Sequence, residues 1–259
     1  DGTNVAKQAS DITITDNSFT SIGRAVMWGR SLYQNIQRFI LFQMIVNVVA
    51  CLVVVFGAFL GEQPPLTVTQ MLWVNLIMDT FAAMALASLP PNERVMQPKP
   101  RNRKDFIITK PMGIIIASIG VLFFAFLMTL LYVFKHYDIK AFADIFLFGE
   151  YRGGIGISPK EGSMFFTVFV MLQFWNMFNA KAYMSGRSAF HFKNCGSFLL
   201  IAAIILAGQV SIVTFGGKMF SVTPLSVADW VVMIALTSLV MILGELARFA
   251  NNHCIKAKA

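Results

Sequence analysis

Long apolar runs limit what this chain can fold into more than any other feature of its sequence. A helix needs about 20 mostly apolar residues to cross a bilayer, and six such runs follow one another between polar connections. Only 13% of the residues are charged and 56% are hydrophobic, whereas a soluble domain is about one quarter charged. We therefore predict an all-α membrane protein with six transmembrane helices, at residues 39–60, 66–89, 112–134, 163–183, 197–215 and 227–247.

The basic residues are distributed unevenly over the connections between these runs. Sixteen of the 21 lysines and arginines lie before the first run, after the second, after the fourth or in the tail. Because cytoplasmic loops collect Lys and Arg, we predict a multi-pass protein with both termini in the cytoplasm. The net charge of +8 has the same origin, so we expect the lipid bilayer as a partner and no nucleic acid.

The first 38 residues differ from the rest of the chain. Residues 10–16 alternate between polar and apolar side chains, which is typical of a short strand. The polar residues at 16–18 then favour a helix start, and apolar residues continue at helical spacing from Phe19 into the first apolar run. We predict one helix over about 19–60, roughly 60 Å long at a rise of about 1.5 Å per residue. Its first part, residues 19–38, would protrude from the bilayer as a stalk.

Asn75 and Asp79 are the most unusual residues inside the apolar runs. A charged side chain at the middle of a transmembrane helix costs roughly 2.5–3.5 kcal/mol, so a partner is expected. At a spacing of four residues, the amide and the carboxylate would point from the same face of a helix. Their oxygens could then bind one cation at the middle of the membrane. Thr80 is expected to bond to its own helix instead.

Further polar residues lie deep in other runs, and they allow two interpretations. Asn47 and Gln173 could add neutral oxygens to a calcium site, which takes six to eight oxygens. They could equally form hydrogen bonds between helices, as could Asn176 and Asn179. Because this set has no His or Cys, it disfavours zinc and copper, and the three cysteines show no CxxC spacing. One carboxylate is too little for calcium, so more ligands must come from elsewhere.

Four segments of the sequence form recognisable motifs, two at the start of the chain and two in and after the apolar run around Asp79. The segments are residues 2–12 (GTNVAKQASDI), 15–22 (TDNSFTSI), 70–79 (QMLWVNLIMD) and 90–91 (PP). Together they resemble P-type ATPases, and most closely their plasma-membrane-type calcium pumps. After about residue 110 the resemblance rests on the helix pattern and on residues 173–176 (QFWN).

The resemblance implies a domain order. Residues 1–18 would end a Rossmann-like phosphorylation domain, and residues 19–38 would form its stalk. Residues 39–250 would contain transmembrane helices five to ten of a pump in the cell membrane, and residues 251–259 a cytoplasmic tail. The start, Asp1 to Asn4, mimics a magnesium-binding motif, but the residues after it match another strand, so no magnesium role is expected for Asp1.

The resemblance also implies which residues bind the transported Ca²⁺. Asn75 and Asp79 match the family's sixth-helix ligands, and Asn47 matches a fifth-helix position used for the other site of two-site calcium pumps. Three departures concern the second site of two-site pumps: Ala50 and Gln173 stand where such pumps carry glutamates, and Met78 replaces a threonine. We therefore expect one calcium site and one calcium ion per cycle.

The family's phosphorylation motif, Asp-Lys-Thr-Gly-Thr, does not occur in the sequence. The resemblance therefore implies that Mg²⁺ and ATP bind in domains outside this chain, and that the chain is a fragment, inactive alone, whose partners are the remaining domains. The short tail predicts no calmodulin-binding extension. Three alternatives stay open: a six-span secondary cation transporter or channel, a structural membrane subunit, and a P-type pump for manganese or protons. An inverted repeat would favour the transporter.

Overall fold

The computed structural model describes residues 2–16, 18–59, 65–102, 104–147, 149–154 and 156–256, and within them the chain is helical with no β-sheet. One isolated antiparallel bridge joins Tyr137 to Tyr151. The helices are α1 (Asn4–Ala9), α2 (Phe19–Phe59), α3 (Val68–Leu72), α4 (Asp79–Ala87), α5 (Lys110–His136), α6 (Pro159–Ala182), α7 (Gly196–Phe215), α8 (Gly217–Phe220) and α9 (Val227–Lys256). A π-helical segment, Trp73–Met78, joins α3 to α4, and 3₁₀ turns lie at Glu93–Met96 and Phe142–Leu147.

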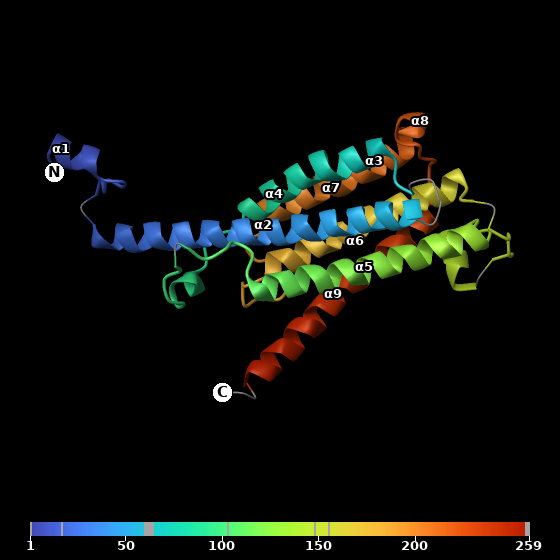
Figure 1. The fold of residues 1–259 in the computed structure, drawn as a ribbon. Coiled ribbons are helices and arrows are strands. Elements are labelled where there is room, and N and C mark those ends of the chain that lie inside the picture. The colour runs from blue at the N-terminus through green and yellow to red at the C-terminus, as the bar shows by residue number, and fades with distance from the viewer. Residues whose placement is uncertain are drawn as a thin grey trace.

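Helix α2 confirms the prediction of one long helix at the start of the chain. It runs without a break for 41 residues, Phe19–Phe59. Just before it, the carboxylate of Asp16 accepts hydrogen bonds from the backbone N–H of Ser18 at 3.1 Å and the hydroxyl of Ser21 at 2.5 Å, which fixes the helix start. In Figure 1 the first part of α2 projects beyond the other long helices, in the position expected of a stalk.

The predicted strand at residues 10–16 is not confirmed by the structure. These residues form bends, and α1 precedes them; Thr3 caps α1 by accepting a hydrogen bond from the N–H of Ala6 at 3.3 Å. A strand is stable only when its backbone groups pair with a neighbouring strand. Residues 10–16 meet no such neighbour among the described residues, so their alternating pattern has no sheet to join.

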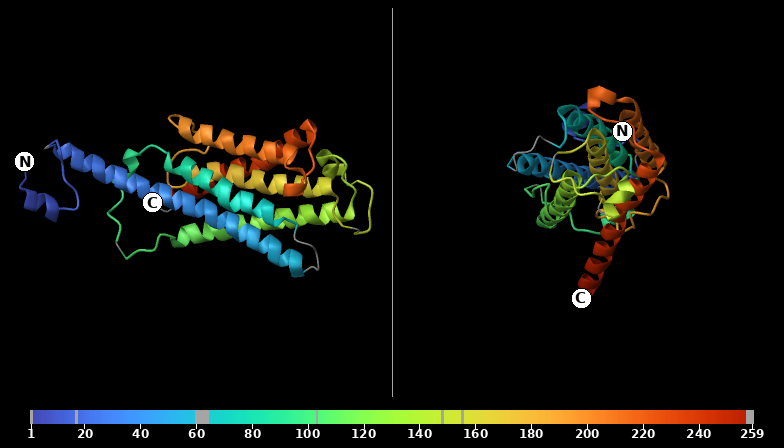
Figure 2. Two further views of the ribbon diagram at one scale, coloured as in Figure 1. Left: turned by 90° about the horizontal axis from the view of Figure 1, so that it is seen from above. Right: turned by 90° about the vertical axis from the view of Figure 1, so that its right-hand side faces the viewer.

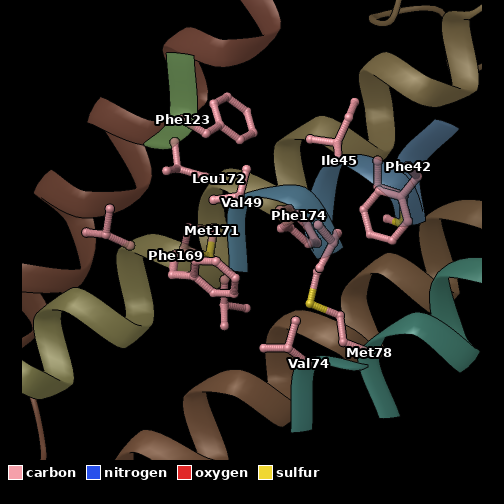
Figure 3. Packing of buried hydrophobic residues seen from close by; sticks show 14 of the residues in the cluster. Phe42, Ile45, Val49, Val74, Met78, Phe123, Phe169, Met171, Leu172 and Phe174 are labelled. Carbon is pink, nitrogen blue, oxygen red and sulfur yellow. The ribbon is translucent and has the colours of Figure 1, made fainter. Parts of the chain in front are cut away.

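The long helices pack side by side into one bundle. Helix α2 packs against α4, α5 and α6, while α6 also packs against α5, α7 and α9. In Figure 2, α6 runs inside the bundle with the other long helices around it. The apolar core lies between these helices; in Figure 3, Phe42, Ile45 and Val49 of α2 meet Phe169 and Phe174 of α6.

Five of the six predicted membrane spans are apolar enough to cross a bilayer. The five segments are Phe19–Gly57, Val68–Ala87, Lys110–His136, Gly196–Phe215 and Val227–Ala250, judged by length and composition within the described residues. The remaining predicted span, 163–183, does form a helix, α6, but it is less apolar. Because 20 of its 24 residues are buried, α6 contacts other helices rather than lipid and tolerates polar side chains. Length and composition within the described residues therefore support five of the predicted spans and leave the span at 163–183 unconfirmed.

The connection before α6 is held together by a buried carboxylate. Glu161 is completely buried and accepts hydrogen bonds from the N–H of Ile139 at 3.1 Å and of Ser158 at 2.7 Å. The guanidinium of Arg152 lies 3.0 Å from the same carboxylate and also contacts Asp138. Ser158 and Glu161 form a capping box at the first turn of α6. Glu161 thus fixes both this connection and the start of α6.

The end of the chain is more helical than the sequence predicted. Helix α9 continues to Lys256, beyond the predicted end of the last span at residue 247. Part of the predicted tail, residues 257–259, lies outside the described residues.

Candidate metal centre

The segment that carries the predicted site has an unusual backbone. The π segment, Trp73–Met78, interrupts the helix, and the N–H of Asp79 donates to the carbonyl of Val74, five residues back. An α-helix bonds to the fourth residue back, so this segment holds one extra residue in its turn. Such π-bulges occur frequently at functional sites. Asp79 is the first residue after the bulge.

Asp79 is buried without a protein partner for one of its oxygens. The side chain is 5% exposed, and Oδ1 has no hydrogen-bond partner among the described residues. A buried polar oxygen costs free energy unless something binds it. The structure therefore leaves this carboxylate oxygen available to a ligand.

Asn75 lies in a different environment from Asp79. It belongs to the π segment and is exposed, whereas Asp79 is buried. The prediction of a common face assumed α-helical turns, and the wider turn of the π segment changes that relation. Thr80 behaves as predicted, because its hydroxyl donates to the carbonyl of Leu76 in its own helix at 2.5 Å.

The other predicted ligands lie on α2 and α6. Asn47 is half-buried on α2. Gln173, on α6, is fully buried, and neither Oε1 nor Nε2 has a hydrogen-bond partner among the described residues. Asn176, one turn further on, is 1% exposed, and its Nδ2 also has none. Gln173 is therefore not an interhelical hydrogen-bond donor or acceptor within the described chain.

Asn179 fulfils the alternative role predicted for these amides. Its Nδ2 donates to the carbonyl of Val240 on α9 at 2.9 Å, and its Oδ1 accepts from Arg248 at 3.1 Å. The close approach of Gly244, where an added Cβ would lie 2.2 Å from Oδ1 of Asn179, makes room for this contact. Asn179 thus joins α6 to α9 and is not a candidate ligand.

The three helices that carry Asp79, Asn47 and Gln173 meet in one part of the core. Figure 3 shows Met78 pointing toward Phe174 of α6, with Ile45 and Phe42 of α2 on the other side of Phe174. Among the described residues no group of three His, Cys, Asp or Glu side chains lies close enough to hold a metal ion. Of the predicted ligands in this part of the chain, Asp79 is the one with a carboxylate, and the others carry amide oxygens.

Sequence reasoning missed the polar residue that holds the π segment. Oε1 of Gln209, on α7, accepts a hydrogen bond from Nε1 of Trp73 at 2.9 Å. Gln209 is fully buried in a helix that is otherwise almost entirely apolar. A single amide in such a helix is the signal that would have identified it, since buried amides require partners.

Comparisons with known proteins identify the family. The family described as "Cation transporting ATPase, C-terminus" matches residues 63–250. The chain is 42% identical over 249 residues to "Plasma membrane calcium-transporting ATPase 2" of Oreochromis mossambicus, covering 95% of this chain and 21% of that protein. It is 42% identical over 233 residues to "Plasma membrane calcium-transporting ATPase 3" of Homo sapiens, covering 88% of this chain and 18% of that protein. The chain spans about a fifth of the length of these curated relatives. The chain belongs to the family of cation-transporting ATPases, and it is similar to plasma membrane calcium-transporting ATPases within that family.

Proposed function

We propose that this chain is the membrane part of an ATP-driven calcium pump and carries part of a single calcium site around Asp79. The observation that carries the proposal is the buried, unpartnered Oδ1 of Asp79 next to a π-bulge. The relatives' names, which describe calcium-transporting ATPases, support calcium as the transported ion. Asp79 would supply charge to the ion, with neutral oxygens from Asn75, Asn47 and Gln173.

The oxygen chemistry of this set favours calcium over softer metals. Calcium takes six to eight oxygens from carboxylates, amides and carbonyls. The residues named here supply fewer, so the remaining ligands would come from helices outside this chain. Mg²⁺ and ATP would bind in cytoplasmic domains outside it, and no residue of this chain is assigned to them.

The proposed topology has six spans with both termini in the cytoplasm. Helix α6 would cross the membrane in addition to the five apolar helices, because it packs against α2, α5, α7 and α9 along the bundle. Residues 1–18 would end the phosphorylation domain, residues 19–38 would form the stalk and residues 251–259 the tail.

Contacts at the base of the stalk support its role as the moving part. Arg38 donates to the carbonyl of Tyr183 at 2.9 Å, and Asn35 donates to that of Leu89 at 3.1 Å. Both carbonyls lie at or just beyond the ends of membrane helices α6 and α4. A tilt of α2 driven by phosphorylation would therefore move these helix ends as well, and would switch the site between the two sides of the membrane.

ATP-driven calcium uptake tests the proposal against its alternatives. Inside-out vesicles containing the full-length pump should accumulate radioactive calcium only when Mg²⁺ and ATP are present. Uptake that needs no ATP but follows an ion gradient would instead support a secondary transporter. Uptake of manganese in preference to calcium, or proton pumping without calcium, would contradict the assignment of the ion.

The single carboxylate of the proposed site predicts how many calcium ions each pump molecule binds. We expect the purified full-length pump to bind one calcium ion at equilibrium in the absence of ATP, because Ala50 and Gln173 supply no further charge for a second ion. Equilibrium dialysis with radioactive calcium, normalised to the number of phosphorylatable sites, measures this. A ratio near two would refute the single site.

A further inference from the structure

We infer that Gln209 and Gly208 of α7 are positioning residues for the calcium site, because they hold the π segment that places Asp79. This inference rests on the proposed function. It assigns a role at the site to α7, a helix from which the sequence predicted no site residue.

Two independent contacts fix the indole of Trp73 against α7. The first is the hydrogen bond from Nε1 of Trp73 to Oε1 of Gln209, at 2.9 Å. The second is a close approach: a Cβ added to Gly208 would lie 2.8 Å from Cη2 of Trp73. Trp73 is 8% exposed and Gln209 is fully buried, so water does not compete for the hydrogen bond. The indole is thus held both at its nitrogen and at the far edge of its ring.

The fixed indole is directly connected to the backbone of Asp79. Trp73 is the first residue of the π segment, and the carbonyl of the next residue, Val74, accepts the hydrogen bond from the N–H of Asp79. If the π segment changed to a regular α-helix, its extra residue would shift the helical register of Asp79 and the residues that follow. One residue corresponds to a rotation of about 100° around the helix axis. Releasing Trp73 would therefore turn Asp79 relative to α2 and α6.

A glutamine at position 209 would be energetically unfavourable if its side chain served only to pack against neighbouring residues. Its Nε2 is buried and has no hydrogen-bond partner among the described residues. A buried unpaired amide is unfavourable, and a leucine of similar size would avoid that cost. The glutamine gains one specific bond, to Trp73, which supports a role in positioning.

Calcium-dependent phosphorylation of the full-length pump tests the inference. We expect Gln209→Leu, Trp73→Phe and Gly208→Ala each to raise the calcium concentration for half-maximal phosphoenzyme formation by about tenfold. The maximal phosphoenzyme level at saturating calcium should be unchanged, because Asp79 itself is retained. The double variant Trp73→Phe/Gln209→Leu should shift the curve no further than either single variant, as expected for two ends of one bond.

Trp175→Phe is the matched control. Nε1 of Trp175 donates to the hydroxyl of Thr237 at 3.1 Å between α6 and α9, a comparable bond away from the π segment. An equal shift in this control would show general loss of packing and overturn the inference, as would unchanged half-saturation in Gln209→Leu and Gly208→Ala. The Asp79→Asn variant separates the two proposals: if it retains calcium-dependent phosphoenzyme, the proposed site itself is wrong.

Discussion

Replacing Asp79 by asparagine in the full-length pump should abolish calcium-dependent phosphorylation by ATP. The substitution keeps the size of the side chain and removes the negative charge that Asp79 would contribute to the proposed site. Loss of one partner from a buried ion pair costs about 3–5 kcal/mol, which corresponds to a hundredfold or greater loss of affinity. Phosphoenzyme formed from radioactive ATP, measured over a range of calcium concentrations, provides the readout.

Thr129→Val is the control for this experiment. The hydroxyl of Thr129 donates to the carbonyl of Ala125 in its own helix, α5, at 2.9 Å, and the residue lies outside the π segment and the proposed site. Its calcium dependence should resemble that of the unchanged pump. Normal phosphoenzyme formation in Asp79→Asn would remove the basis for placing calcium at this residue, provided that both variants are recovered folded from the membrane.

Replacing Glu161 by leucine should produce the largest loss of stability among single substitutions outside the site. The change would leave the charge of Arg152 partly unpaired and would remove the acceptor for the N–H groups of Ile139 and Ser158. Breaking a buried ion pair from one side costs about 3–5 kcal/mol, equivalent to a decrease of several degrees in the midpoint of thermal unfolding for a unit of this chain's size. Unfolding of the detergent-solubilised pump, followed by aggregation or by thiol labelling, measures this midpoint.

Two further variants define what Glu161 contributes. Glu161→Gln keeps an acceptor oxygen for the backbone but loses the charge facing Arg152, so its effect should be intermediate. Glu150→Gln changes an exposed carboxylate of the same connection and should leave the midpoint within about 1 °C. Equal midpoints for Glu161→Leu and Glu150→Gln would contradict the role given to the buried network.

Local patterns were sufficient to predict most of the fold. The unbroken helix over Phe19–Phe59 was predictable because the helical spacing of its apolar residues has no interruption. The strand at residues 10–16 was not, because alternation indicates a strand only where a neighbouring strand is present to pair with it. Helix α6 was predicted in its position, but the sequence did not distinguish a helix facing lipid from one enclosed by other helices.

The candidate site was predictable in chemistry and not in geometry. An acidic residue within an apolar run is informative by itself, and Asp79 is indeed buried with an unpartnered oxygen. The environment of Asn75 depends on the π segment, whose first residue, Trp73, is held by α7 more than 130 positions later in the chain. No local pattern around Asp79 reports such a contact.

The enclosure of α6 also has a consequence for how the protein is made. A nascent segment partitions from the insertion machinery into lipid according to its own hydropathy. The polar side chains of Thr167, Gln173 and Asn176 lower the hydropathy of α6. Its retention in the bilayer would then depend on helices already present, such as α2 and α5, and on α7 and α9 arriving soon afterwards. Helix α6, the most central helix of the bundle, would therefore depend most on the other helices for its insertion into the membrane.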